Sequence, residues 1–558
     1  MAPQLQLNSG PQDALLYDNT RSYFTNVGYV RTSNFQMELR DIDPQNTPSL
    51  GGTVNFVIPK AADLLGPCDL MVDFNKVQNP DAQSSTLQSN VAWGWVENVG
   101  MAMIDKITFS VGSHDVEVLT GDHLNIINEL MRDDAHRYGY KQTLRTGRPL
   151  LRAQAAGSTY TQFIDTDNDA HDRIMLYKGG SGSAVVRNGK KLVIPLGLFF
   201  TKHPSAYFPI AAIAGVNDIR IQIKFKTKDE LIMGHSAYPV VSGVVTHTNA
   251  PPLAGLNGLA FENGTAFARC QLRCHYVHVT GPEATSLMNR EHVRLMKLWH
   301  GNEVSKMFTL STHKGTPTDS DMVTWAIDLS FLHPVTEIVI TIRKTSEMSS
   351  STQTDTRINV RNNQKARTKN YFAYQGGKVD PNVEAYEHSV EETGSSTSTK
   401  QNRLEVKNFK LTLNGQSRHL DGAGVDRDYL MNRLMPLMHS NADDRFDHIY
   451  QTSMKMIPGG TPNTTQTEPS VDFHALSQLN DRKEIYCYPF SLAPESANPS
   501  GAVNFSKVSH ARLELGVIGH APGLSSGSTS SDDYQVDVYG VYYNWLAIKD
   551  GRAMTSFA

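Results

Sequence analysis

Strict alternation of apolar and polar residues is the clearest pattern in this chain. Residues 511–517 read ARLELGV and residues 219–225 read IRIQIKF, and in both segments every second side chain is apolar. A period of two is expected for a β-strand with one buried and one solvated face. Each segment follows a loop that contains proline, which ends strand pairing and fixes the path of the chain. The pattern therefore predicts strands of a β-sandwich.

These alternating strands end two longer segments that are alike. Lys191–Phe225 and Tyr488–Val517 both run from an apolar strand with an internal proline, through a proline-containing loop, to the alternating strand. The two segments lie about three hundred residues apart. They predict the same strand–loop–strand unit in each half of the chain.

A second repeated unit precedes each of these segments. Ile107–Met131 and Phe409–Met435 both predict a strand, a tight turn and a short helix, with the turn at Gly112 in one and at Asn414-Gly415 in the other. A repeat this long predicts a duplicated domain rather than a solenoid, whose period is far shorter. The alternative is that any two antiparallel β-domains look alike at this level. The matching position of the helix favours duplication.

The length of the chain agrees with two domains, because 558 residues exceed what one hydrophobic core supports. We expect an arm without periodicity at residues 1–30, a first β-domain at 31–262 and a second at 263–558. Long polar insertions are expected at residues 78–90, 147–188 and 344–402, the last of which is the largest.

Charge and hydropathy exclude several classes of protein. The 52 basic and 56 acidic residues give a net charge of −4, so there is no global case for nucleic-acid binding. The first twenty residues lack the cationic region and apolar core of a secretory signal. The longest uncharged apolar run, Phe208–Val216, is too short to span a bilayer. We therefore expect a soluble protein that stays inside the cell.

The four cysteines predict no disulfide framework. Cys270 and Cys274 fall in one expected strand, where a rise of about 3.3 Å per residue separates them by about 13 Å, beyond disulfide reach. Cys68 and Cys487 are expected to stand alone. No CxxC pair is present in the sequence, so we expect a reducing compartment and no structural zinc site.

The sequence offers little catalytic chemistry. It contains no phosphate-binding GxxxxGK[ST] loop, no HExxH and no GxGxxG after a strand. One GxSxG is centred on Ser525, but its flanks predict a loop rather than the strand and helix of a nucleophile elbow. Three aspartates and a histidine at residues 443–448 could bind a cation, although a loop of solvated charges is the favoured interpretation. We predict no catalytic, cofactor or metal site.

The 344–402 insertion carries the one local basic segment that we weighed as a binding site. Between residues 356 and 379 it holds six basic residues and no acidic ones, together with Tyr371, Phe372 and Tyr374. Basic residues interleaved with aromatic ones can bind single-stranded nucleic acid. Acidic residues follow directly, so we favour a solvated loop that pairs with acidic loops of a neighbouring subunit. We predict no specific nucleic-acid partner.

Several short motifs occur in a fixed order along these segments. They are a Pro-Leu pair before an aromatic run, a strand that begins HPV-E, an Asn-Gly turn and a PSG…NFS loop. Their residues are Pro195, Leu196, His333, Pro334, Glu337, Asn414, Gly415, Pro499, Ser500, Gly501, Asn504 and Phe505. Together these motifs resemble the double jelly-roll major capsid proteins of nucleocytoplasmic large DNA viruses, over nearly the whole chain.

The resemblance implies an all-β fold of two tandem eight-stranded jelly rolls, with short helices and long loop insertions. It implies a major capsid protein that trimerises into pseudo-hexagonal capsomers and tiles the icosahedral shell of a large double-stranded DNA virus. Such a protein is structural rather than an enzyme and needs no cofactor. The alternative is a two-domain β-sandwich glycan-binding protein or hydrolase.

The same resemblance implies partners and a location. The expected partners are two further copies in a homotrimer, neighbouring capsomers, and minor capsid and penton proteins. The arm at residues 1–30 is expected to face the inner membrane side. The expected location is the virion capsid, after assembly in the cytoplasm of the host cell.

Overall fold

The computed structural model of this chain describes most of both expected β-domains. The described residues are 33–75, 77–78, 91–96, 98–130, 174–175, 191–236, 240–241, 244–245, 260–300, 304–312, 321–348, 366–367, 371–372, 374–376, 403–419, 424–439, 456–458, 469–471, 484–520 and 530–556. The expected arm, Ser525 and the 443–448 cluster lie outside them, as do most of the three long insertions. Within the described residues, no helix is long and apolar enough to cross a membrane.

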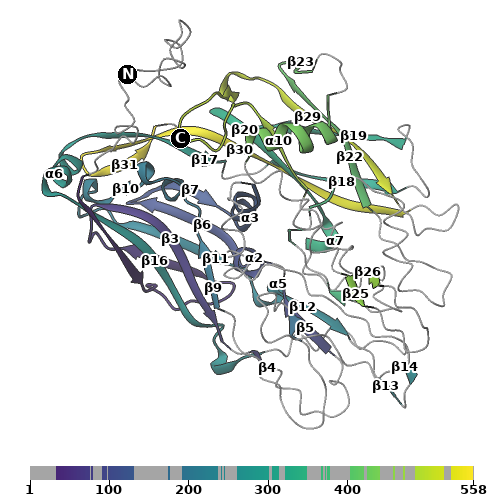
Figure 1. Cartoon of the computed structure of the whole chain (residues 1–558), viewed down its shortest axis with the longest axis horizontal. Helices are drawn as coiled ribbons and strands as arrows, with labels where there is room; N and C mark the ends of the chain where they lie inside the picture. Colours follow the sequence, from purple (N-terminus) through teal and green to yellow (C-terminus); the bar gives the residue numbers. More distant parts are fainter. Residues whose placement is uncertain are drawn as a thin grey trace, which may run out of the picture.

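The first β-domain is a sandwich of two antiparallel sheets (Figure 1). One sheet has the order β1-β16-β3-β10, with β9 also paired to β3, and the other has the order β2-β11-β6-β7. The strands are β1 Phe35–Ile42, β2 Thr53–Ile58, β3 Leu64–Phe74, β6 Ile104–Val111, β7 His114–Leu119, β9 Lys191–Pro195, β10 Phe208–Pro209, β11 Ile219–Phe225 and β16 Phe267–Val279.

Strand β11 confirms the alternation predicted from sequence. The isoleucines at 219, 221 and 223 and Phe225 are buried, and the three polar residues between them are exposed. Ile221 lies opposite Phe109 of β6, whose ring centroid is 5.1 Å from that of Phe200 and 5.4 Å from that of Phe208. The buried face of β11 therefore belongs to an aromatic and aliphatic core between the two sheets.

The second β-domain is also a sandwich of two antiparallel sheets. One has the order β17-β30-β20-β27, with β18 and β31 paired to β30 and β28 paired to β20; the other has the order β19-β29-β22-β23, with β24 paired to β22. The strands are β17 His292–Trp299, β18 Val304–Thr312, β19 Val323–Leu329, β20 Pro334–Lys344, β22 Arg403–Leu413, β23 Gln416–Ser417, β24 Val425–Asp426, β27 Ile485–Pro489, β28 Val503–Asn504, β29 Ala511–His520, β30 Ser530–Lys549 and β31 Arg552–Thr555.

The two domains share one strand order, which confirms the predicted duplication. In the first domain β11 lies between β2 and β6, and in the second β29 lies between β19 and β22. Likewise β3 lies between β16 and β9, and β20 lies between β30 and β27. The predicted turns also correspond, because Gly112, Asn414 and Gly415 all adopt positive φ, at 63°, 51° and 79°.

Strand β16 corrects the predicted domain boundary. We expected residues from 263 onward to belong to the second domain, but β16 pairs with β1 and β3 of the first. It is the counterpart of β30, the strand that occupies the same place in the second domain. Sequence alternation gives the face of a strand but not its neighbours in the sheet, so the pattern could not assign β16.

Short helices and strands connect these sheets. The helical segments are α2 Val99–Ala102, α3 Gly121–Leu130, α5 Lys228–Leu231, α6 Gly281–Asn289, α7 Thr345–Met348, α9 Arg427–Tyr429, α10 Met435–Met438, the π-helical η10 Leu430–Leu434, and the 3₁₀ turns η4 Phe199–Thr201, η5 Pro204–Ala206, η6 Ile210–Ala212, η8 Glu262–Gly264 and η12 Phe505–Lys507. The remaining strands are β4 Val77–Gln78, β5 Val91–Trp95, β8 Ile174–Met175, β12 Ile232–Ser236, β13 Val240–Val241, β14 Val244–Val245, β15 Ala260–Phe261, β21 Ala366–Arg367, β25 Met456–Pro458 and β26 Pro469–Val471.

Candidate functional site at the junction of the two domains

Helix α3 lies where the two domains meet (Figure 1). It begins at Gly121, where the backbone lies close to its own domain. The position requires glycine, because a Cβ there would collide with the carbonyl oxygens of Met101 and Ile104. The His123 N–H donates to Thr120 Oγ1 at 3.4 Å, which caps the first turn of the helix. The close approach at Gly121 and the cap from Thr120 thus set the start of α3 and hold the helix against the first domain.

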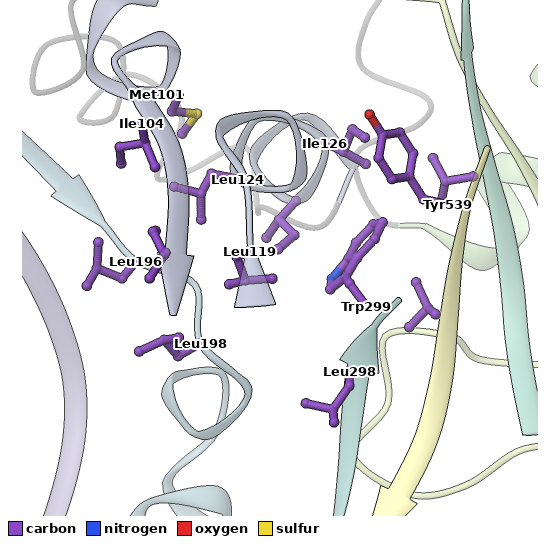
Figure 2. Packing of buried hydrophobic residues seen from close by; sticks show 14 of the residues in the cluster. Met101, Ile104, Leu119, Leu124, Ile126, Leu196, Leu198, Leu298, Trp299 and Tyr539 are labelled. Carbon is purple, nitrogen blue, oxygen red and sulfur yellow. The ribbon is translucent and has the colours of Figure 1, made fainter. Parts of the chain in front are cut away.

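The apolar part of the junction joins α3 to two strands of the second domain (Figure 2). Ile126 of α3 points toward Tyr539 of β30, near Trp299 of β17, while Leu124 points back toward Ile104 and Leu196 of the first domain. All of these side chains are buried and belong to one continuous hydrophobic core. Because separating the domains would expose this apolar surface to water, the junction resists separation.

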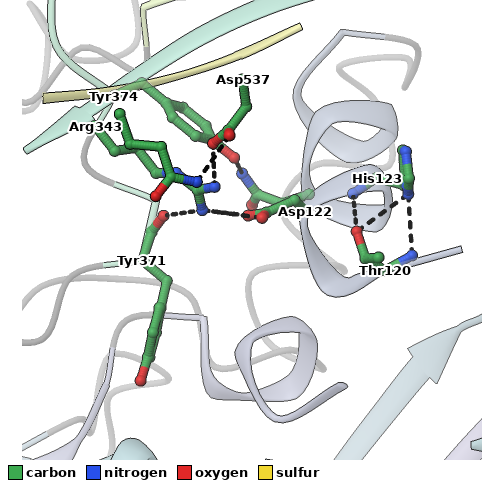
Figure 3. A network of polar contacts seen from close by, with 9 residues as sticks. Thr120, Asp122, His123, Arg343, Tyr371, Tyr374 and Asp537 are labelled. Atoms are coloured by element: carbon green, nitrogen blue, oxygen red, sulfur yellow. Dashed lines mark hydrogen bonds and ion pairs between the residues drawn. The ribbon is translucent and has the colours of Figure 1, made fainter. Parts of the chain in front are cut away.

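Arg343 of β20 is the centre of the polar part of the junction (Figure 3). Its Nη1 donates to both carboxylate oxygens of Asp122 on α3, each at 2.9 Å, and its Nη2 donates to Asp537 of β30. Arg343 is 4% exposed and Asp537 is 0% exposed. Burial acts to lower the pKa of Arg343, but the Asp122 carboxylate raises it well above its usual value. A charged, buried network therefore links the two domains.

His123, which Figure 3 shows bonded to Thr120, forms a second contact across the junction. The Thr120 N–H donates to His123 Nδ1 at 3.0 Å, so in the neutral ring Nε2 carries the proton. The ring centroids of Trp299 and Tyr539 each lie 5.0 Å from that of His123. Burial lowers the pKa of His123 to about 3, which keeps the imidazole neutral at physiological pH.

Comparisons with known proteins identify this pair of joined sandwiches. Residues 22–277 match the family described as "Major capsid protein N-terminus". The major capsid protein of Phaeocystis pouchetii virus is 20% identical over 98% of this chain and 98% of its own length. In fold, the chain is similar to the PBCV-1 virus capsid protein, with a TM-score of 0.55 and 15% identity over 96% of this chain and 100% of that one. In sequence and in fold, the chain is similar to major capsid proteins of the double jelly-roll class.

Two further relatives agree with this assignment. The major capsid protein of Pyramimonas orientalis virus is 24% identical over 41% of this chain and 47% of its own length. The Faustovirus major capsid protein has a similar fold, with a TM-score of 0.53 and 13% identity over 95% of this chain and 93% of that one. The predicted double jelly-roll fold is confirmed. The count of eight strands in each roll stays a prediction.

Two of the sequence motifs meet in the structure. Strand β28 pairs with the start of β20, which places Asn504 opposite Pro334. The His333 N–H donates to Ser506 Oγ at 2.9 Å, and the Phe505 N–H donates to the His333 carbonyl at 3.0 Å. The HPV-E and NFS motifs together therefore fix one end of β20. Their role as marks of the family stays a prediction.

The other motif residues lie apart from this contact. In the first jelly roll, Pro195 ends β9 and Leu196 is fully buried. In the second, Asn414 Oδ1 accepts from the Ser509 N–H at 2.8 Å, which holds the turn that Gly415 completes.

The PSG motif closes the loop between β27 and β28. Ser500 Oγ accepts from the Ala493 N–H at 2.9 Å, and the Leu492 N–H donates to the Ser500 carbonyl at 3.2 Å. Pro499 precedes this pair, and Gly501 adopts φ 126°, in a region that disfavours other residues. These residues shape a loop, and the structure does not bring them to the junction.

The three aromatic residues that the structure describes in the 344–402 insertion are buried rather than available to stack on bases. Tyr371, Phe372 and Tyr374 all belong to the core. The Tyr371 hydroxyl donates to the Glu230 carbonyl at 2.9 Å, and Lys226 Nζ lies 4.1 Å from the centroid of the Tyr371 ring. The predicted solvated loop is therefore wrong at these three residues, which anchor the insertion of the second roll on the first. The side chains of the six basic residues lie outside the described part of the chain.

The cysteines also differ from expectation at one position. Cys68 of β3 was expected to stand alone, but it lies opposite Cys274 of β16, with 3.5 Å between the two Sγ atoms. Both are buried free thiols, and burial raises the pKa of the Cys68 thiol. The pairing of β3 with β16 creates this contact, and sequence spacing gave no sign of it.

An exposed apolar patch covers the outer face of β17, β30 and β31. Val293 lies opposite Ala547, which in turn lies opposite Met554, and Trp545 is two residues away on the same face of β30. Val293 is 63% exposed, Trp545 42% and Met554 45%. Large apolar side chains gathered on a solvated sheet are a feature often found at interaction surfaces.

Proposed function

We propose that three copies of this capsid protein associate around a threefold axis into a pseudo-hexagonal capsomer, and that these capsomers tile the icosahedral shell of a large double-stranded DNA virus. The observation that carries the proposal is the junction, which fixes two jelly rolls of equal strand order in one block. Three such blocks place six similar units around one axis. Joining two rolls in one chain also removes the entropy cost of associating them.

The exposed patch on β17, β30 and β31 is our candidate for the contact between copies. We assign it to a neighbouring copy of the same chain, because a closed trimer needs a surface on each protomer that is buried only after assembly. The patch combines a tryptophan with aliphatic side chains, the residue types that dominate the buried centres of interfaces.

Light scattering on the purified full-length chain tests the trimer. The expected mass is three times the 61.8 kDa of one chain, and negative-stain images should show particles with a hexagonal outline. The chain is to be produced together with any folding factor that it needs. A stable monomer at micromolar concentration under those conditions would contradict the proposal.

We further infer that the first jelly roll ends with β16 and the second begins with β17. The arm at residues 1–30 would face the inner membrane side and the minor capsid proteins, and the insertions would contact neighbouring capsomers or the exterior. Penton proteins would close the shell at its vertices, and assembly would take place in the cytoplasm of the host cell. Crosslinking of purified virions followed by mass spectrometry tests these contacts.

The proposed role requires no catalysis. The alternative of a glycan-binding protein or hydrolase predicts that Ser525→Ala abolishes an activity while leaving the assembly state unchanged. The capsid role predicts equal particle yield from Ser525→Ala and the wild type, and no hydrolase activity in either.

A further inference from the structure

Three side chains from distant segments converge beside the sheet that contains β20. Glu337 of β20, Cys487 of β27 and His439 after α10 each offer one ligand atom, and these atoms all lie within 4.8 Å of one another. All three residues are at most 1% exposed. A carboxylate oxygen, an imidazole nitrogen and a thiol sulfur are the ligand set that Zn²⁺ prefers in proteins.

Strand register explains why Glu337 and Cys487 approach. Cys487 lies opposite Val339, and Glu337 is two residues before Val339 on the same face of β20. Such diagonal neighbours on paired strands are within side-chain reach. The end of α10 then brings His439 over the same place, because the His439 N–H donates to the Met435 carbonyl at 2.8 Å.

The hydrogen bonds of His439 have the arrangement found around metal-bound histidines. Its Nε2 lies 2.8 Å from Glu337 Oε2, on the side of the cluster, and its Nδ1 lies 3.1 Å from Glu495 Oε1. Histidines that bind zinc usually donate their other ring N–H to a carboxylate, which fixes the tautomer and the orientation of the ring. Glu495 is in position to play that role.

An unsatisfied atom points to a missing partner. Glu337 Oε1 is buried and has no hydrogen-bond partner within the part of the chain that the structure describes. A buried carboxylate oxygen without a partner is costly, so such atoms are rare in folded proteins. A cation between Glu337, His439 and Cys487 would satisfy it.

We propose that Glu337, His439 and Cys487 form a structural site for a zinc-like divalent cation, with Glu495 as the residue that positions His439. Zinc bonds of about 2.0–2.3 Å place two ligand atoms about 3.3–3.8 Å apart. The ligand atoms, now within 4.8 Å of one another, would have to rearrange, and the 2.8 Å contact between His439 and Glu337 would have to open. The cation would replace one proton on His439 and one on Cys487, so the net charge of the buried cluster stays the same. Its role would be to tie α10 to β20 and β27.

Metal analysis of the full-length chain, made without a histidine tag, tests the site. After incubation with zinc and removal of the excess, we expect about one zinc per chain in the wild type. Cys487→Ser should lower this at least tenfold, and Glu495→Gln should weaken zinc binding about tenfold or more. Cys270→Ser is the matched control, because Cys270 is also buried but lies in the first jelly roll.

Cobalt provides a second measurement that does not depend on whether Cys487→Ser folds. Wild-type protein loaded with Co²⁺ should show thiolate-to-cobalt charge-transfer absorption, and the control Cys270→Ser should show the same band. A wild type that binds no zinc and shows no such band would overturn the proposal and leave the cluster as a buried ion pair. Full zinc occupancy in a folded Cys487→Ser would overturn it equally.

Discussion

At the scale of single residues, the junction between the jelly rolls depends on groups whose charge is fixed by burial. Arg343 must be charged because two carboxylates face it, and His123 must be neutral because aromatic rings surround it. Sequence reasoning missed both. Neither residue belongs to a spaced motif, and their partners are hundreds of positions away in the chain. Only the docking of one roll on the other defines their environment.

Replacing Arg343 by leucine should destabilise the protein by about 3–5 kcal/mol, because the buried carboxylate of Asp537 would lose its cationic partner. Denaturant unfolding of the purified chain measures the change. The matched control is Arg220→Leu, whose pair with Asp218 is exposed, and which should cost at most about 1 kcal/mol. Equal losses in the two variants would show that the Arg343 network does not hold the junction.

Acid should weaken the junction through His123. The pKa of His123 is about 3 in the folded protein against 6.5 for a free histidine, so below pH 6.5 the unfolded chain binds more protons. The contribution of His123 to stability is thus lost as the pH falls from 6.5 toward 3, by at most about 1.4 kcal/mol per pH unit. Denaturant unfolding of the wild type and of His123→Phe between pH 4 and 8 measures this pH-dependent part of the free energy of unfolding.

His123→Phe should lose this part of the pH dependence, even though it also loses the hydrogen bond from Thr120. His114→Phe is the control, since His114 is exposed on β7. If the wild type and His123→Phe lose stability in parallel as the pH is lowered, His123 is not the cause of the acid sensitivity.

At the scale of elements, the sequence predicted strands well where one face is solvated and poorly where both faces are buried. The alternation of β11 gave its inward face correctly. In β20 the same rule would place Glu337, Thr341 and Arg343 toward solvent, yet all three are buried. Their face of the strand bears on the first jelly roll and on α10, and no local pattern encodes that contact.

The proposed metal site was beyond sequence reasoning for a related reason. We expected no structural zinc site, because zinc motifs are recognised by ligands close together in sequence. Here the ligands come from positions 337, 439 and 487, and only the register of β20 with β27 brings two of them together.

Two glycines beside β22 should differ in their tolerance of a methyl group. Gly415 adopts φ 79° in open space, so Gly415→Ala should cost about 1 kcal/mol from backbone strain alone. Gly424 adopts φ 90°, and a Cβ there would also collide with the Phe409 carbonyl oxygen, so Gly424→Ala should cost clearly more. Thermal unfolding of both variants shows which of them loses more stability. The reverse order would mean that the close approach of residue 424 to β22 is not maintained in solution.

At the scale of the whole molecule, the exposed patch on β17, β30 and β31 should decide assembly. Trp545→Lys places a charge in the proposed contact and should shift the chain from trimer to monomer in light scattering, with little change in folding because Trp545 is exposed. Val216→Lys serves as the control, since Val216 is isolated in a turn and 94% exposed. A Trp545→Lys variant that remains trimeric would exclude this face as the contact.

The order of strands along the chain has a consequence for synthesis on the ribosome. The first jelly roll is complete once β16 has emerged, but the larger sheet of the second roll waits for β30, about 250 residues later. During that interval a nascent chain presents His123 and Ile126 without Trp299 and Tyr539 packed in their final places. Partly made copies on one messenger RNA therefore carry the same uncovered helix face, and protection of that face during translation would limit their aggregation.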